Sequence, residues 1–121
     1  MKRAIFLGVL ITVAVPLDAG ERLAMRITPA AALEPAILTV RTVIEADAGN
    51  RVLEIVAQSA DYYRSSSIEL DGASAPRLNV FEFRNLPTGS YEVTSVLVRS
   101  GGGGASVTRR FQVAPSRGSA R

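Results

Sequence analysis

Apolar and polar residues alternate along most of the chain beyond position 25, a pattern typical of β-strands rather than helices. In the segment Ile37–Glu45, Leu38, Val40 and Ile44 fall on one side, and polar residues such as Arg41 fall on the other. Successive side chains of a strand point to opposite faces, whereas the apolar face of a helix repeats every 3.6 residues. The chain is therefore expected to form strands that each bury one face.

Turn residues divide this pattern into short segments at intervals of about 10 residues, a spacing that suggests a β-sandwich. No long helical pattern separates them, which argues against alternating strands and helices. We predict an all-β fold, a seven-stranded antiparallel sandwich, as one domain over residues 20–113. Residues 30–35 are expected to form a connection, residues 59–66 a loop or an edge crossing, and residues 114–121 a disordered tail. The expected strands are Met25–Thr28, Ile37–Glu45, Val52–Ala57, Ser67–Leu70, Leu78–Arg84, Tyr91–Arg99 and Ser106–Val113.

The alternation also predicts which side chains face the core and which face outward. The expected inward residues are Leu38, Val40, Ile44, Leu53, Ile55, Ala57, Phe81, Phe83, Phe111 and Val113. The outward positions include the valines Val43, Val52, Val56, Val96 and Val98. Such an apolar outer surface indicates either an interface or the preference of valine for strands.

The first nineteen residues have the layout of a secretory signal peptide. Lys2 and Arg3 precede a twelve-residue apolar run, Ala4–Val15, and a small residue, Ala19, follows soon after. A membrane-spanning helix needs about 20 apolar residues, so no stable membrane anchor is expected after cleavage. We predict a signal peptide at 1–19, with a cut after Ala24 as the alternative, and a periplasmic or secreted location in a bacterium.

Composition excludes several classes of function. The chain has no cysteine, histidine or tryptophan, which excludes disulfide scaffolds, Cys/His zinc sites and Ser-His-Asp or Cys-His catalysis. Without residues 1–19, 12 arginines, no lysine and 10 acidic residues remain, a net charge of +2. The arginines are scattered among the acidic residues, and only Arg109-Arg110 and the tail arginines hint at a basic patch. Because nucleic-acid binding needs such a patch, no nucleic-acid partner is expected.

The most specific motif is Asn85-Leu-Pro-Thr-Gly-Ser-Tyr-Glu-Val93. Leu86 is expected to cap the core, Pro87 to restrict the backbone, and Gly89 to permit a turn that most residues resist. Tyr91 would then enter the next strand pointing inward, with its hydroxyl bound to a backbone group upstream. The motif resembles the tyrosine corner of immunoglobulin-like and fibronectin type III-like sandwiches, which implies that fold for the whole domain.

A second family shares part of this motif. Carboxypeptidase-regulatory-like, transthyretin-like domains also carry a strand followed by L-P-x-G-x-Y-x-V, and residues 67–72 are similar to their preceding strand and turn. The Asp-Gly turn that usually lies directly before the F-x-F strand is displaced here, because residues 73–79 intervene. The immunoglobulin-like resemblance is therefore preferred, and neither resemblance specifies a ligand.

Tyr62, Tyr63 and Arg64 are the candidate residues for contact with a ligand or partner. Aromatic faces beside an arginine stack on sugars or grip a peptide. The competing interpretation is that one tyrosine packs as a lid on the sandwich. If the segment is a strand, the two tyrosines point to opposite faces.

Other motifs do not amount to a site. Asp47, Asp61 and Asp71 lie in or near turns, without the array of ligands that calcium needs. Glu69 and Asp71 share one face of a strand, but no cleft or substrate-binding aromatic marks them as a catalytic pair. Gly101–Gly104 lacks the Lys-Ser/Thr of a phosphate-binding loop and is expected to form a hairpin tip. No catalytic, metal or cofactor residues are predicted.

These observations favour an exported, non-catalytic β-sandwich with a structural, adhesive or protein-binding role. Exposed edge strands in such a fold can accept a strand from a partner protein. The alternative is a carbohydrate-binding module that uses Tyr62 or Tyr63 to hold a polysaccharide. A hydrolase is the least favoured interpretation, and no cofactor is expected.

Overall fold

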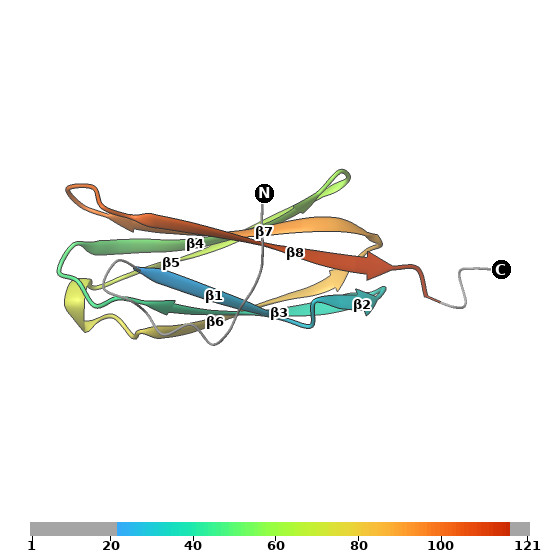
Figure 1. Cartoon of the computed structure of the whole chain (residues 1–121), viewed down its shortest axis with the longest axis horizontal. Coiled ribbons are helices and arrows are strands. Elements are labelled where there is room, and N and C mark those ends of the chain that lie inside the picture. The colour runs from blue at the N-terminus through green and yellow to red at the C-terminus, as the bar shows by residue number, and fades with distance from the viewer. Residues whose placement is uncertain (1–21, 117–121) are drawn as a thin grey trace, which may run out of the picture.

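A computed structural model of the protein describes residues 22–116, which form two β-sheets packed face to face (Figure 1). The predicted signal peptide and the last five residues of the predicted tail lie outside this range. No helix in the described part is long and apolar enough to cross a membrane. The elements are β1 (Leu23–Thr28), β2 (Ala31–Leu33), β3 (Ala36–Ile44), β4 (Asn50–Ser59), β5 (Tyr62–Glu69), the 3-10 turn η1 (Gly72–Ser74), β6 (Leu78–Leu86), β7 (Gly89–Arg99) and β8 (Ala105–Ala114).

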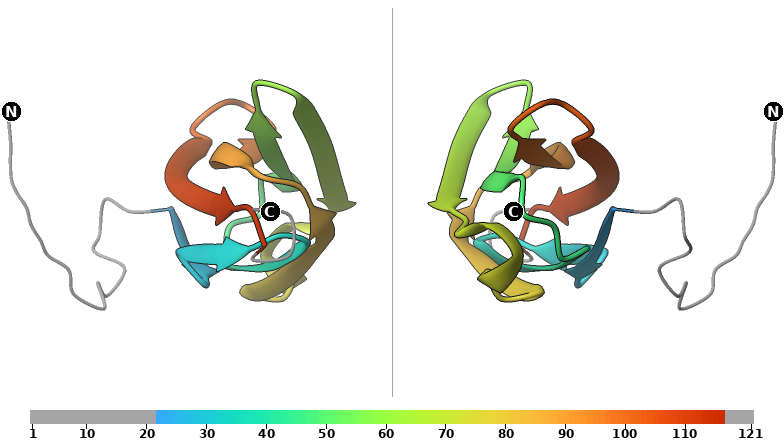
Figure 2. Two further views of the ribbon diagram at one scale, coloured as in Figure 1. Left: turned by 90° about the vertical axis from the view of Figure 1, so that its right-hand side faces the viewer. Right: turned by 90° about the vertical axis from the view of Figure 1, so that its left-hand side faces the viewer.

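One sheet has three strands in the order β1-β3-β6, and the other has five in the order β2-β8-β7-β4-β5. All neighbouring strands are antiparallel except β2 and β8, which are parallel. The end-on views in Figure 2 show the smaller sheet beneath the β4, β5, β7 and β8 strands of the larger one. The predicted all-β sandwich is therefore confirmed.

The core lies between the sheets and follows the predicted alternation. In β3, every second residue from Ala36 to Ile44 is buried, and the residues between them are exposed or half-buried. Every residue predicted to face inward is buried in the structure. The buried side chains interdigitate in one continuous cluster, which is the main source of stabilisation for a domain of this size.

Of the two alternatives for residues 59–66, the loop is wrong, because β5 occupies most of this segment at the edge of its sheet. β5 pairs with β4 from Val52↔Glu69 to Ser59↔Tyr62. It is an edge strand, and only Tyr62 and Ile68 pack against the core from it. A strand that buries so little does not need alternating apolar residues, so its serine-rich sequence resembles a loop.

The other predicted connection, at residues 30–35, contains a short additional strand. β2 lies parallel to the end of β8, and the Glu34 amide donates a hydrogen bond to the Ala114 carbonyl (2.9 Å). The sandwich therefore has eight strands rather than seven. β8 also runs through Ala114, the first residue of the predicted tail, because this pairing satisfies its backbone.

Ser95 is a polar residue in the core. It lies on β7 between Ile55 and Val107 of the neighbouring strands, and its buried hydroxyl has no hydrogen-bond partner within residues 22–116. Replacing Ser95 with alanine should raise the free energy of unfolding by about 1 kcal/mol, because a buried, unpaired hydroxyl is unfavourable. Urea denaturation checks this, with the exposed Ser106→Ala as the control. A loss of stability in Ser95→Ala would contradict the prediction.

Candidate functional site

The three residues predicted to contact a ligand lie at the start of β5 and point alternately to the two faces. The Tyr62 ring is half-buried and packs edge-on against Tyr91, with ring centroids 5.6 Å apart. The Arg64 guanidinium lies 5.7 Å from the centre of the Tyr62 ring. Tyr63 points outward and is 64% exposed. The expectation that the two tyrosines occupy opposite faces is confirmed, and Tyr62 is the lid.

The tyrosine corner forms as predicted between β6 and β7. The Tyr91 hydroxyl donates a hydrogen bond to the Pro87 carbonyl (2.7 Å), and Leu86 is completely buried. The turn residue was assigned wrongly, however. Asn85, with a φ of 61°, adopts the left-handed conformation, and Gly89 does not. Asparagine tolerates this conformation better than most residues, so the turn does not require glycine there.

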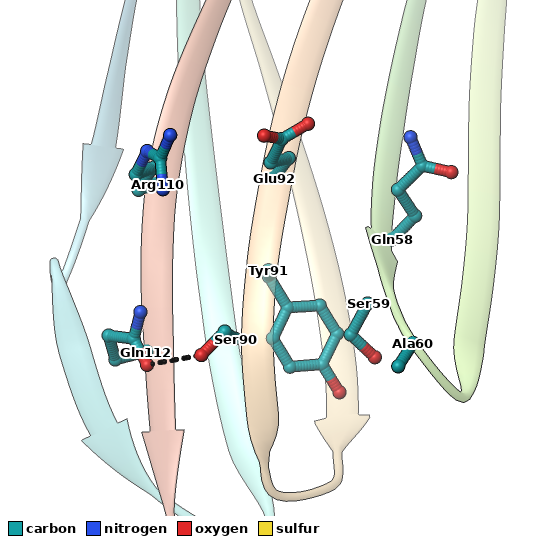
Figure 3. A pocket seen from close by; sticks show the side chains of 8 residues that line it. All are labelled: Gln58, Ser59, Ala60, Ser90, Tyr91, Glu92, Arg110 and Gln112. Carbon is teal, nitrogen blue, oxygen red and sulfur yellow. Dashed lines mark hydrogen bonds between the residues drawn. The ribbon is translucent and has the colours of Figure 1, made fainter.

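A shallow hollow lies beside this corner on the outer face of the five-stranded sheet (Figure 3). It forms because the pairing of β4 with β7 ends at Gln58↔Glu92, beyond which β4 turns into β5. The space has a volume of about 310 Å³, and the almost completely buried Tyr91 forms part of its boundary. It is lined by Gln58, Ser59, Ala60, Ser90, Tyr91, Glu92, Arg110 and Gln112.

Four outward side chains lie in one line across the sheet, and three of them also line the hollow. Strand register places Tyr63 of β5 beside Gln58 of β4, Gln58 beside Glu92 of β7, and Glu92 beside Arg110 of β8. We call these four residues the polar row. Figure 3 shows that Gln58, Glu92 and Arg110 stand at one level on three neighbouring strands. Of these four residues, only Tyr63 could be identified from the sequence as a candidate contact, because the other three come together through non-local pairing.

The polar groups of the row are not engaged with the rest of the protein. In the part of the chain that the structure describes, the side chains of Gln58, Glu92 and Arg110 make no hydrogen bond or ion pair. In contrast, the neighbouring Ser90 hydroxyl donates to the Gln112 carboxamide oxygen (2.9 Å). The row therefore presents amide, carboxylate and guanidinium groups that are available to a ligand.

A second candidate surface lies on the outer face of the three-stranded sheet. Leu78 and Val80 of β6 are 56% and 54% exposed, and Val43 of β3 lies beside Leu78. Arg41 of β3 lies between Val80 and Arg26 of β1. We call these five residues the apolar–basic face. Within residues 22–116, neither Arg26 nor Arg41 has an ion pair or a side-chain hydrogen bond.

The five outward valines of the sequence analysis do not form one surface. Val43 belongs to the apolar–basic face, whereas the other four, Val52, Val56, Val96 and Val98, lie on the outer face of the five-stranded sheet. Leu78 and Val80 were missed, although the alternation around Phe81 and Phe83 already placed them outward. Of the four valines on the larger sheet, only Val98 is strongly exposed.

The remaining sequence motifs have local structural roles. The Asp47 carboxylate accepts a hydrogen bond from the Gly49 amide (2.8 Å), as turn chemistry predicts. Asp71 begins the η1 turn, Glu69 is exposed on β5, and Gly101–Gly104 form the tip of the β7–β8 hairpin. Residues 22–116 contain no cluster of three or more side chains of the types that hold a metal ion.

No family model matches the chain, and no curated protein sequence matches it. Among solved structures, it is similar to the superoxide reductase (neelaredoxin) of Ignicoccus hospitalis, with a TM-score of 0.61 and 11% identity over 76% of this chain and 80% of that chain. A second structure, of a variant of that protein, gives a TM-score of 0.62 and 11% identity over 76% of this chain and 79% of that chain. The sporulation control protein Spo0M of Bacillus subtilis gives a TM-score of 0.48 and 17% identity over 77% of this chain and 49% of that chain. At 11% identity the likeness to the two superoxide reductase structures is one of fold, and it supports the two-sheet β-sandwich.

Proposed function

We propose that the protein is an exported, non-catalytic binding domain that contacts a protein partner through the apolar–basic face. The observation that carries this proposal is the exposure of Leu78 and Val80, two large apolar side chains on one face of an edge strand. Full burial of a leucine or valine side chain contributes about 1.5–3 kcal/mol. Covering both residues is therefore a substantial source of binding energy.

The arginines on this face indicate the chemistry of the partner. Arg26 and Arg41 lie directly opposite each other on β1 and β3, and like charges in this position are unfavourable. An acidic group on a partner would relieve this repulsion while apolar groups beside it cover Leu78 and Val80. The face therefore suits a protein surface with an apolar centre and an acidic edge.

The N-terminal strand supports removal of a signal peptide before residue 22. Leu23 is buried in the core, and the Arg22 carbonyl accepts a hydrogen bond from the Glu45 amide (2.9 Å). A cut after Ala24 would remove both interactions, so a cut after Ala19 suits the fold better. This cut would deliver an intact sandwich to the periplasm or the exterior.

We place the domain among immunoglobulin-like sandwiches. The support is the tyrosine corner between β6 and β7, together with the pairing of β3 with β6 and of β4 with β7, which gives a Greek-key connection between the sheets. The non-catalytic role rests on side-chain chemistry. The chain has neither histidine nor cysteine, so it lacks imidazole and thiolate ligands for a redox metal, as well as a histidine general base and a cysteine nucleophile.

Site-specific photo-crosslinking tests the binding proposal. With a photoreactive amino acid at Leu78, irradiation of cells that export the protein should yield one discrete adduct with a second, different protein. The matched control is Thr108, an exposed position on the outer face of the other sheet, which should yield none. Adding Arg41→Glu should reduce the yield of the adduct at Leu78 roughly tenfold, because this substitution reverses one of the two charges that attract the partner.

Three results would contradict this proposal. They are no discrete adduct at Leu78, the same adduct at Thr108, or an adduct only with a second copy of the chain. A further contradicting result is sedimentation with anionic lipid vesicles that Arg41→Glu abolishes, because it would identify a membrane surface instead. Arg41→Glu lies on the surface and is expected to change the free energy of unfolding by no more than about 0.5 kcal/mol. A lower adduct yield would therefore report weaker binding and not a folding defect.

A further inference from the structure

We propose that the polar row and the hollow beside it form a binding site for a neutral saccharide. This site lies on the outer face of the five-stranded sheet, whereas the apolar–basic face belongs to the other sheet. The inference therefore does not depend on the proposed protein partner.

The charges of the row select against ions. Arg110 alone would attract an anion, but Glu92 stands directly opposite it on the neighbouring strand. Side chains in such positions lie roughly 5 Å apart, so any small ion near one charge is repelled by the other. A ligand that is neutral overall and carries both donors and acceptors suits this pair best.

The hydrogen-bonding groups match adjacent hydroxyls. The Glu92 carboxylate accepts, the Arg110 guanidinium donates, and the Gln58 carboxamide does both. None of these three side chains has a partner within residues 22–116, so a ligand does not have to break internal bonds. A saccharide ring presents hydroxyls that donate and accept at closely spaced positions.

The row also contains an apolar surface. The exposed Tyr63 ring lies beside Gln58 at one end of the row, and aromatic rings of this kind offer a rigid, amphipathic contact. The C–H face of a sugar ring can stack on it while the hydroxyls reach the polar groups. The volume of the hollow, about 310 Å³, lies at the lower end of the roughly 300–1,000 Å³ typical of small-ligand sites.

Backbone amide shifts of the isotope-labelled protein test this site. The probes are neutral tetrasaccharides of glucose, of mannose and of N-acetylglucosamine, each added up to about 10 mM, a range suited to weak affinities. At least one should produce saturable shifts centred on Gln58, Glu92 and Arg110. Tyr63→Ala and Arg110→Ala should each weaken that binding about tenfold or more.

Arg109→Ala is the matched control, because Arg109 is also an exposed arginine and lies on the opposite face of the same strand. It should leave the affinity within about twofold. The inference is overturned if no probe gives saturable shifts at the row, or if binding survives both Tyr63→Ala and Arg110→Ala. It is also overturned if inorganic phosphate saturates the same amides while the saccharides do not, since the site would then bind an anion.

Discussion

Replacing Arg99 with alanine should lower the free energy of unfolding by about 3 kcal/mol. Only 7% of the Arg99 side chain is exposed, at the end of the sandwich opposite the tyrosine corner. Its Nε donates to the Asn50 side-chain oxygen (2.8 Å), and its Nη2 donates to the backbone carbonyl (3.3 Å) and the carboxylate (3.2 Å) of Glu45. Without Arg99, the completely buried Asn50 keeps an acceptor that nothing satisfies.

The loss comes mainly from the buried acceptors and not from the ion pairs. The carboxylates of Glu45 and Asp47 are 42% and 45% exposed, so their attraction to Arg99 is weakened by water and contributes at most about 1 kcal/mol. Arg99→Lys should therefore recover only part of the stability, because one ammonium group does not reproduce the fork of a guanidinium. In a chain of this size, a loss of about 3 kcal/mol is a large fraction of the total stability.

Urea denaturation of four variants tests this account: Arg99→Ala, Asn50→Ala, the two combined, and Arg84→Ala. Arg84→Ala removes an arginine that pairs with Glu82 on the surface (2.9 Å), and it should cost no more than about 0.5 kcal/mol. The double variant Arg99→Ala and Asn50→Ala should lose less than the sum of the two single losses, because both residues belong to one network. Equal losses for Arg99→Ala and Arg84→Ala, or full additivity with Asn50→Ala, would show that the network does not stabilise the fold.

Features that depend on neighbouring residues in the sequence were predictable. The alternation in Ile37–Glu45 identified β3 and its buried face, because a strand between two neighbours in a packed sheet must bury every second side chain. The corner at Leu86 and Tyr91 was also predictable, since its hydrogen bond joins residues only four positions apart.

Features that depend on pairing between distant residues were not predictable in this way. Only the end of β5 was predicted, within the expected strand Ser67–Leu70, because an edge strand buries little and carries no strong pattern. Gln58, Glu92 and Arg110 lie far apart in the sequence and become neighbours only through the register of β4, β7 and β8. Alternation assigns each of them to an outer face but not to a common row, so the candidate saccharide site required the structure.

Replacing Tyr91 with alanine should lower the free energy of unfolding by about 4 kcal/mol, and replacing it with phenylalanine should lower it by about 1–2 kcal/mol. The ring is almost completely buried and packs against Tyr62 and Phe111, with centroids 5.6 Å and 6.0 Å away. Alanine removes this packing and leaves a cavity. Phenylalanine keeps the packing but leaves the Pro87 carbonyl without its 2.7 Å hydrogen bond. Equal losses for the two variants would show that the ring does not pack as described.

Tyr91 should also make the free energy of unfolding decrease in alkaline solution. Burial raises the pKa of Tyr91 above its ordinary value, so in the folded protein the hydroxyl stays protonated where the unfolded chain already loses the proton. The unfolded state then binds fewer protons, and the free energy of unfolding decreases as the pH rises above about 10. Residues 22–116 contain no lysine or cysteine, whose ordinary pKa values would also lie in or near this alkaline range. Urea denaturation at about pH 8 and about pH 11 should therefore show a smaller decrease for Tyr91→Phe than for the unmodified protein. An equal decrease in both would mean that Tyr91 is not the residue that holds its proton in the folded state.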